Sequence, residues 1–456
     1  MTLRVLAGGR RADGSAVPDG GRPAVPGLLI TGAAEIATFA GGPRRGPSQD
    51  EAALLGDRPA IAAYDGRIVA VGQEPDVRRA LAAAGYTDEA RFTVIDARGG
   101  TVTPGLIDPH THLLFAGERE AELGLRQRGA SYLEILAAGG GILSTVAHTR
   151  AASASELHEH GRRWLDEMLA HGVTTVEAKS GYGLDLPTEL RLLEVAGALG
   201  EEGPIEIVPT FLGAHAVPPE YRDRPGGGTD AYLAAILREQ LPGIAAQGIA
   251  RFCDVFCEVG VFSADQSRRL LLEAERLGLS PRLHADELAP SGGAELAADL
   301  GAASADHLAA PSREGVVALA RAAESEHPVV ATLLPATTLF LLKSRDAPAR
   351  TYIERGIPVA LGSDFNPGTS PTPNLQLVLS LAVLRLRMTP TEALAAVTIN
   401  AAQALWLADT HGSLEPGKQA DLVVWDVPSH RQIPYWLGAD LARVVVKRGQ
   451  VVLARA

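Results

Sequence analysis

The 456-residue sequence predicts an α/β fold: a (β/α)8 TIM-like barrel with a small β-sandwich domain built from both ends of the chain. Between about residues 103 and 407, short apolar segments alternate with helical segments, which is the pattern of βα units and a parallel sheet. On both sides of this region the pattern is that of strands alone. A chain of this length is too long for one simple core, so two domains are expected.

The small domain is expected to come from residues 27–102 together with 408–456. Residues 1–26 are rich in Gly, Pro and Arg and are expected to form a flexible extension. Asp65-Gly66 is a two-residue hairpin turn, and residues 41–58 are expected to be a loop inserted within this unit. The strand patterns of this domain lie at 27–30, 60–64, 67–71, 91–96, 421–425 and 444–447.

The barrel is assigned to residues 103–407 because eight strand patterns with crossover helices fit about 300 residues. Ser153-x-x-Glu156 and Ser263-x-x-Gln266 are capping boxes that begin helices, and Gly278 is a stop signal for the second. Thr389, followed by a proline at the first helical position, begins the last expected helix. The predicted barrel strands are 103–110, 172–178, 205–211, 251–257, 280–284, 302–306, 328–334 and 357–362.

Composition restricts the class of protein. The net charge of −12 argues against nucleic acid or an anionic membrane as a partner. No apolar run approaches the roughly 18–20 residues of a membrane span, and the N-terminus has no secretory signal, so a cytoplasmic protein is expected. The two cysteines, Cys253 and Cys257, are expected to be buried residues on one strand face rather than a disulfide or metal ligands.

Two histidines end the first barrel strand. Side chains at positions i and i+2 of a strand point the same way, so His110 and His112 face one point and are able to share a metal ion. Pairs of surface histidines are common, and this spacing alone is weak evidence. It gains weight because the carboxyl ends of all barrel strands converge on one site.

The ends of the later strands carry the remaining chemistry. The fifth strand ends in His284 and the eighth in Asp364, which with the first pair supply three imidazoles and one carboxylate. Such a set suits one divalent metal that keeps a water molecule, and it accepts zinc or iron equally. The metal would make hydroxide available near neutral pH.

Proton transfer needs a further group beside that metal. Glu287 lies three residues beyond His284 and is predicted to take the proton of the water and pass it to a leaving nitrogen. His307, at the end of the sixth strand, is predicted to donate to the oxyanion or to hold the hydroxide in place. The sequence leaves open which of the two carries each proton step.

These motifs resemble those of the amidohydrolase superfamily: HxH on the first strand, His-x-Asp-Glu on the fifth, Asp-His on the sixth and Ser-Asp on the eighth. The closing segment 412–422 is similar as well. Within the superfamily the chain resembles the imidazolonepropionase family. The residues that carry this narrower match lie at 110–120, 139–142, 176–184, 211–215 and 364–369. The resemblance covers nearly everything from residue 100 onward, and excludes 1–26 and 41–58.

The resemblance implies hydrolysis of the lactam of 4-imidazolone-5-propanoate to N-formimino-L-glutamate in L-histidine degradation, by a homodimer acting on a small anionic substrate. It places the metal on the same four ligands. A planar guanidinium such as Arg119 suits the propionate of that substrate. The substrate contacts that the resemblance implies are Arg119, Tyr182, His215, Glu287, Asn366, Gly368 and Thr369.

Alternatives remain open at this point. A deaminase of a nucleobase-like ring would use the same metal machinery, and a non-catalytic homologue would keep the barrel as a scaffold. Lys179 follows the second strand, whereas some amidohydrolases bridge two metals with a carboxylated lysine after the fourth. We therefore expect one metal, with Lys179 as an ion-pair or hydrogen-bond partner that orients the site.

Overall fold

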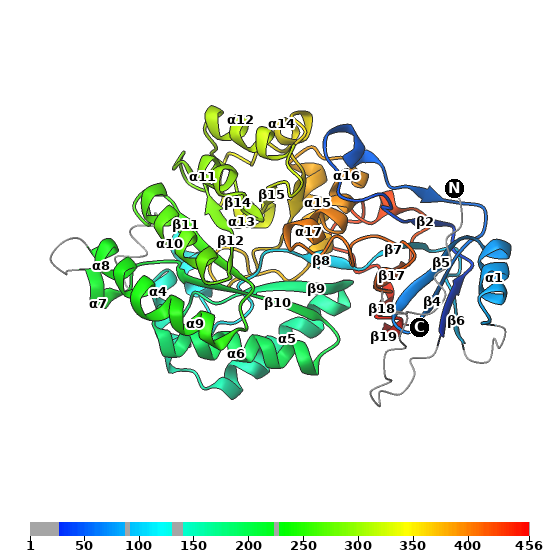
Figure 1. Ribbon diagram of the computed structural model, residues 1–456, viewed down its shortest axis with the longest axis horizontal. Helices are drawn as coiled ribbons and strands as arrows, with labels where there is room; N and C mark the ends of the chain where they lie inside the picture. The colour runs from blue at the N-terminus through cyan, green and yellow to red at the C-terminus, as the bar shows by residue number, and fades with distance from the viewer. Residues whose placement is uncertain (1–26, 87–91, 130–139, 223–227, 456) are drawn as a thin grey trace.

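The computed structural model describes residues 27–86, 92–129, 140–222 and 228–455 of the chain (Figure 1). The extension predicted for residues 1–26 lies outside the described residues. No helix in the described part of the chain is both long and apolar enough to cross a membrane.

A parallel sheet of eight sequential strands forms the barrel, as predicted. Its strands follow one another in chain order, and each neighbouring pair is parallel. The ring closes between the segments that follow β8 and β16, where His112 N donates to Phe365 O at 2.9 Å and Asp364 N donates to His110 O at 3.0 Å. The strands are β8 (Leu106–Asp108), β9 (Val173–Lys179), β10 (Glu206–Ala214), β11 (Phe252–Cys257), β13 (Leu283–Ala285), β14 (Ser304–His307), β15 (Val330–Leu333) and β16 (Val359–Leu361), with the short β12 (Ser280–Pro281) beside β11.

The first predicted strand, 103–110, is in fact two strands in two sheets. β7 (Thr101–Pro104) pairs with strands of the small β unit, whereas β8 belongs to the barrel. Gly105 lies between them, where an added Cβ would stand 2.3 Å from Oγ1 of Thr174. Glycine therefore lets the chain pass from one sheet to the other against the neighbouring strand.

Helices surround the barrel. The two predicted capping boxes begin α5 (Ala154–Ala170) and α10 (Ala264–Arg276), and α16 (Pro390–Ala396) begins after Thr389 with a proline at its first position, as predicted. The expectation that α16 is the last helix was wrong, because α17 (Ile399–Ala404) follows it. All six residues of α17 are buried, so it lacks the polar face that marks a helix in a sequence. The other helices of this region are α2 (Glu120–Gln127), α4 (Ile142–Ala151), α6 (Leu186–Glu202), α7 (Pro219–Arg222), α8 (Gly228–Ala235), the π-helix η3 (Ile236–Gln240), α9 (Leu241–Gln247), α11 (Gly293–Leu300), α12 (Arg313–Ala322), α13 (Pro335–Phe340), α14 (Ala349–Glu354) and α15 (Leu375–Leu384).

The small β unit consists of two sheets beside the barrel (Figure 1). One has the order β5-β4-β1-β6 and the other β19-β18-β17-β7-β2-β3, so strands from the two ends of the chain pair with each other through β17 and β7. Leu28, Ile61 and Val424 belong to the apolar cluster packed between them. The strands are β1 (Gly27–Thr31), β2 (Glu35–Ala37), β3 (Leu54–Leu55), β4 (Pro59–Tyr64), β5 (Arg67–Gln73), β6 (Phe92–Asp96), β17 (Leu422–Trp425), β18 (Ala442–Lys447) and β19 (Gln450–Ala454), with helix α1 (Glu74–Ala83) after β5 and the 3-10 helix η4 (His430–Gln432) after β17.

Two local predictions in this unit have different outcomes. Asp65 and Gly66 form the hairpin turn between β4 and β5, with φ of 49° and 72°. Residues 41–58 are not a plain loop, because they contain the 3-10 helix η1 (Gly46–Asp50) and strand β3. The buried Gln49 side chain exchanges two hydrogen bonds, at 3.1 and 3.2 Å, with the backbone of Val359 on β16. The exact domain limits stay a prediction.

Candidate metal centre and active-site pocket

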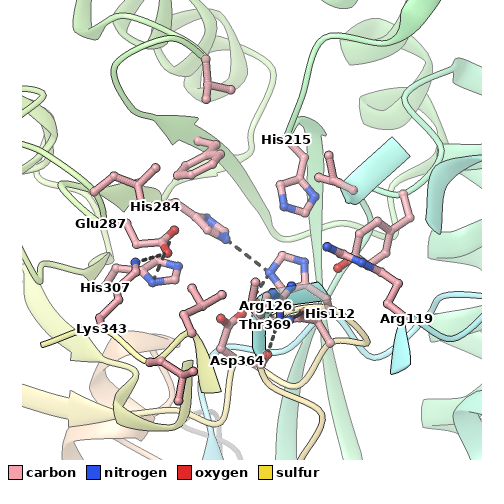
Figure 2. A pocket seen from close by; sticks show the side chains of 18 of the residues that line it. His112, Arg119, Arg126, His215, His284, Glu287, His307, Lys343, Asp364 and Thr369 are labelled. Atoms are coloured by element: carbon pink, nitrogen blue, oxygen red, sulfur yellow. Dashed lines mark hydrogen bonds and ion pairs between the residues drawn. The ribbon is translucent and has the colours of Figure 1, made fainter. Parts of the chain in front are cut away.

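Four side chains from three parts of the barrel rim lie close together, and Figure 2 shows three of them: His112, His284 and Asp364. Nε2 of His110 lies 3.5 Å and Nε2 of His112 lies 3.4 Å from Oδ1 of Asp364. Nε2 of His284 lies 3.3 Å from Nε2 of His112. The structure therefore brings together the four residues for which the sequence predicted metal binding, and all four are buried.

The chemistry of these donors fits a cation. The buried Nε2 of His110 has no hydrogen-bond partner, and two imidazole nitrogens face each other at 3.3 Å beside a carboxylate. A divalent metal would satisfy all of these atoms, and nitrogen with oxygen ligands suits zinc or iron. Among the described residues, His307 and His215 complete two further groups able to hold an ion, each of which includes His284.

A buried ion-pair network lies behind two of the histidines. Nδ1 of His110 is 2.6 Å from Asp306, and Nδ1 of His284 is 3.0 Å from Asp254. Lys179 contacts both carboxylates, with Nζ at 2.8 Å from Asp254 and 3.8 Å from Asp306. Lys179 is thus an ion-pair partner behind the site, as the sequence suggested.

Arg282 is a member of this network that sequence reasoning missed. Its Nη2 lies 3.1 Å from Asp306, and the residue is fully buried. It stands two positions before His284, so the i, i+2 rule that was applied to His110 and His112 would have placed it on the same side as His284. Burial raises the pKa of Asp306, but the charge of Arg282 and the hydrogen bond with His110 outweigh it, and the net shift is downward.

Glu287 and His307 lie next to each other at the pocket wall. Nδ1 of His307 is 3.8 Å from Oε2 of Glu287. Burial lowers the pKa of His307 to about 4, so this imidazole is neutral near pH 7. Burial raises the pKa of Glu287, but the charges of His307 and of Lys343 outweigh it, and the net pKa is below the ordinary value. Because His307 is neutral above about pH 4, Lys343 is the cation that acts on this carboxylate near neutral pH.

Lys343 is a second residue that sequence reasoning missed. It follows α13, and its Nζ donates to Oε1 of Glu287 at 2.9 Å. It lines the same pocket as Glu287. No sequence pattern marks it, because it lies in the connection between α13 and α14 and not at the end of a strand.

Arg119 lies in the pocket wall, but its guanidinium is already paired. Nε and Nη2 donate to the two carboxylate oxygens of Glu122 at 3.0 and 2.9 Å. Glu122 also accepts from Arg126 at 3.2 Å and from the backbone N–H of Gly141 at 2.6 Å. Glu122 therefore occupies the edge of the guanidinium that carries Nε and Nη2. Gly139, the first residue of the neighbouring glycine motif, lies outside the described residues.

The turn after Asp364 supports that arginine. Oδ1 of Asn366 accepts the backbone N–H of Gly368 at 2.9 Å and that of Thr369 at 2.8 Å. The structure also gives a steric reason for a glycine at position 368. A Cβ at this position would stand 1.9 Å from Nη1 of Arg119, so the missing side chain makes room for the guanidinium.

His215 and Tyr182 lie beside His112. The rings of His215 and His112 stack with centroids 4.8 Å apart, and the Tyr182 ring centroid is 5.3 Å from that of His215. Burial lowers the pKa of His215 well below its usual value, so the ring is neutral. Its Nδ1 donates to Gly181 O at 3.0 Å, which leaves Nε2 as an acceptor.

The pocket around these groups has a volume of about 470 Å³, which suits a small molecule. In Figure 2 Arg119 lies on one side of His112, and Glu287 lies on the other. A guanidinium and a carboxylate thus lie on opposite walls of the pocket, with the candidate metal centre between them. Its walls also contain apolar residues: Ile142, Phe256, Val261, Leu288, Leu341 and Leu342.

Comparison with known proteins identifies the family. Two models of the Amidohydrolase family match residues 263–452 and 93–177. The imidazolonepropionase of Geobacillus kaustophilus (strain HTA426) is 49% identical over 93% of this chain and 98% of its own length. The chain belongs to the imidazolonepropionase family. The imidazolonepropionase of Symbiobacterium thermophilum is 50% identical over 93% of this chain and 97% of its own length.

Solved structures with the same fold have lower sequence identity to this chain than the imidazolonepropionases do. A zinc-bound adenosine deaminase from Xanthomonas campestris superposes with a TM-score of 0.64 at 19% identity, covering 94% of this chain and 93% of its own. A 5-methylcytosine deaminase from Klebsiella pneumoniae, liganded with 5-fluorocytosine, gives a TM-score of 0.69 at 17% identity, covering 94% and 98%. These neighbours confirm the barrel fold of this imidazolonepropionase-family chain.

Proposed function

We propose that this chain hydrolyses the lactam C–N bond of 4-imidazolone-5-propanoate and forms N-formimino-L-glutamate, a step of L-histidine degradation. The observation that carries this proposal is the sequence identity of 49–50% to imidazolonepropionases over 93% of the chain. The pocket supports it, because a guanidinium lies opposite a carboxylate across the candidate metal centre.

We assign one divalent metal ion per chain, zinc or iron, to His110, His112, His284 and Asp364. A metal in this position would polarise the lactam carbonyl and lower the pKa of a water molecule. The buried and unpartnered Nε2 of His110 supports this assignment. Asp254 and Asp306, both ion-paired with Lys179, hold the rings of His284 and His110 from behind.

In this proposal Glu287 moves the proton. The oxygen of water forms a bond to the lactam carbonyl carbon, and Glu287 accepts the proton that this oxygen loses. The C–N bond then breaks, and Glu287 returns the proton to the ring nitrogen, so that water is added across the bond. His307, neutral and 3.8 Å from Glu287, donates a hydrogen bond to the developing oxyanion.

The far side of the pocket would bind the propionate. Nη1 of Arg119 occupies the space that a side chain at position 368 would fill, and Asn366 holds that turn in place by accepting the N–H groups of Gly368 and Thr369. Tyr182 closes the wall beside it. His215 offers an unprotonated Nε2, so we assign it to accept a hydrogen bond from a ring N–H of the substrate.

The remaining assignments are general. We propose a homodimeric, cytoplasmic enzyme with a small anionic substrate and no nucleic-acid or membrane partner. The net charge of −12 supports the last point. We also propose that the β-sandwich domain comprises residues 27–102 and 408–456, and the barrel residues 103–407.

Product analysis tests the reaction. The purified protein is mixed with imidazolonepropanoate in ¹⁸O-labelled water, and the product is identified by mass. We expect N-formimino-L-glutamate with one labelled oxygen in a carboxylate and no free ammonia. Ammonia released at the catalytic rate would favour a deaminase instead, and a chain that binds no metal would favour a scaffold without catalysis.

A further inference from the structure

We infer that Lys343 is the residue that positions Glu287 for proton transfer, by fixing one carboxylate oxygen and leaving the other free for the proton. This inference rests on the proposed function, in which Glu287 is the proton carrier. Lys343 lines the same pocket, and the side chain that its ammonium group contacts is Glu287, so its role is one of positioning.

The contact between the two side chains is direct and shielded. Nζ of Lys343 lies 2.9 Å from Oε1 of Glu287, and the exposed fractions of the two side chains are 25% and 12%. Oε2 points instead toward His307, at 3.8 Å from Nδ1. The ammonium group therefore holds one oxygen of the carboxylate, and the other oxygen faces the catalytic side of the pocket.

The backbone holds Lys343 in a defined place. Its N–H donates to Thr338 O at 3.1 Å, which closes the end of α13. The preceding residue, Leu342, has φ of 53°, so the chain turns sharply there. The carbonyl oxygen of Lys343 accepts a hydrogen bond from Nη2 of Arg385, directly after α15, at 3.4 Å. Arg385 also forms an ion pair with Asp346 at 3.1 Å.

The same short helix also contacts a metal-site carboxylate. Near its start, Oγ1 of Thr337 donates to Oδ2 of Asp364 at 2.6 Å. One helix of six residues therefore fixes a candidate metal ligand through its first turn and the proton carrier through the turn that follows it. This arrangement sets the two carboxylates relative to each other, which proton transfer at the metal centre requires.

The substitution Lys343→Met tests this inference, because it keeps the length of the side chain and removes the ammonium group. We expect kcat to fall by roughly 10²-fold, the usual effect of a displaced catalytic group, with KM nearly unchanged. We expect the acid limb of the kcat profile to move to higher pH, since the carboxylate loses its cation and its pKa rises. Lys343→Arg restores a cation and is expected to recover most of kcat.

Arg345→Met is the matched control, because it removes an exposed cation two positions along the same connection and should leave kcat and its pH profile as they are. The metal content of Lys343→Met should equal that of the unchanged protein. A loss of metal, or of thermal stability beyond that of the control, would assign the effect to a disturbed site and overturn the inference.

A second readout does not need the substrate. The titration of the Glu287 carboxyl is followed by infrared difference spectroscopy, with Glu287→Gln to assign the band. We expect its pKa to be higher in Lys343→Met and nearly unchanged in Lys343→Arg. An unchanged pKa in Lys343→Met overturns the inference. If the infrared shift is present but the protein does not hydrolyse imidazolonepropanoate, the proposed function fails and the contact stands.

Discussion

Asp306 accepts a hydrogen bond from Nδ1 of His110 at 2.6 Å, and this contact decides which nitrogen of the ring faces the metal site. Because its neighbours keep Asp306 ionised, the aspartate accepts and the imidazole donates. In the neutral ring that binds a metal, Nε2 then carries the lone pair, and it points to Asp364, 3.5 Å away. A ring oriented in this way is prepared to bind a metal, and an orienting carboxylate commonly raises ligand basicity.

Replacing this carboxylate should weaken metal binding. Asp306→Asn keeps the volume but removes the charge, and we expect metal affinity to fall by about 10- to 100-fold. Metal titration of the apo-protein measures it. Asp421→Asn is the control, because Asp421 is also buried and ion-paired, 2.7 Å from Lys447, but lies in the small β unit. It should lose stability and keep its metal affinity. Equal affinities for Asp306→Asn and the unchanged protein would contradict the orienting role.

Glu287 provides the test of mechanism. Glu287→Gln keeps the size of the side chain but cannot accept a proton, so kcat should fall by about 10²–10⁴-fold. The candidate metal ligands are untouched, and metal content should stay the same. KM should change by about tenfold at most, because one contact is altered and not removed. Steady-state kinetics together with metal analysis measures both. If kcat stays nearly unchanged, the proton is carried by another group, and His307 becomes the first to test.

Arg119 and Gly368 provide the test of the substrate anchor. Arg119→Ala should raise KM strongly without loss of metal, because it removes the cation that faces the propionate. Gly368→Ala should act in the same direction, because its Cβ would stand 1.9 Å from Nη1 of the arginine and displace it. Gly56→Ala is the control, since a Cβ there meets nothing within 4 Å. A KM that rises for Arg119→Ala but not for Gly368→Ala would show that the guanidinium moves aside freely.

The barrel and the four converging donors were predictable because each depends on a local rule. Strand patterns place residues in the sheet, and the carboxyl ends of parallel strands meet at one rim. His110, His284 and Asp364 lie within or directly after their strands, so pattern and chemistry coincide in the sequence. The predicted strand 103–110 was wrong in its limits, because the chain changes sheets at Gly105. The predicted position of the histidines was still correct, because β8 ends at the same rim of the barrel.

The supporting residues were not predictable in this way. Glu122 matters because it holds Arg119, and Lys343 matters because it holds Glu287, 56 positions away. Such pairs form only once the chain is folded. From the sequence alone, a charged residue in a connection between two helices is expected to be exposed to solvent. Arg282 is an intermediate case, since its spacing from His284 was visible but an inward arginine is expected only when buried carboxylates are known to lie beside it.

Glu206, at the start of β10, joins the barrel to the small β unit. Its Oε2 lies 3.0 Å from Arg448, 3.2 Å from Lys447 and 3.2 Å from Nε2 of His411. Burial raises its pKa, but the hydrogen bond from His411 and the charge of Lys447 outweigh it, and the net pKa is well below the ordinary value. A carboxyl of this kind stabilises the fold above its unfolded pKa of about 4.3, and the contribution is lost as the pH falls through the folded value.

Glu206→Gln should therefore lower the free energy of unfolding by about 1.5–3 kcal/mol at neutral pH, the usual cost of losing hydrogen bonds to a charged group. The difference from the unchanged protein should begin to shrink below about pH 4.3 and vanish once the pH is below the folded pKa. Denaturant unfolding at a series of pH values measures it. Glu201→Gln, at an exposed position near the end of α6, should change the free energy by less than about 0.5 kcal/mol. If the difference in the free energy of unfolding between Glu206→Gln and the unchanged protein does not depend on pH, packing and not the charge of this carboxylate joins the two units.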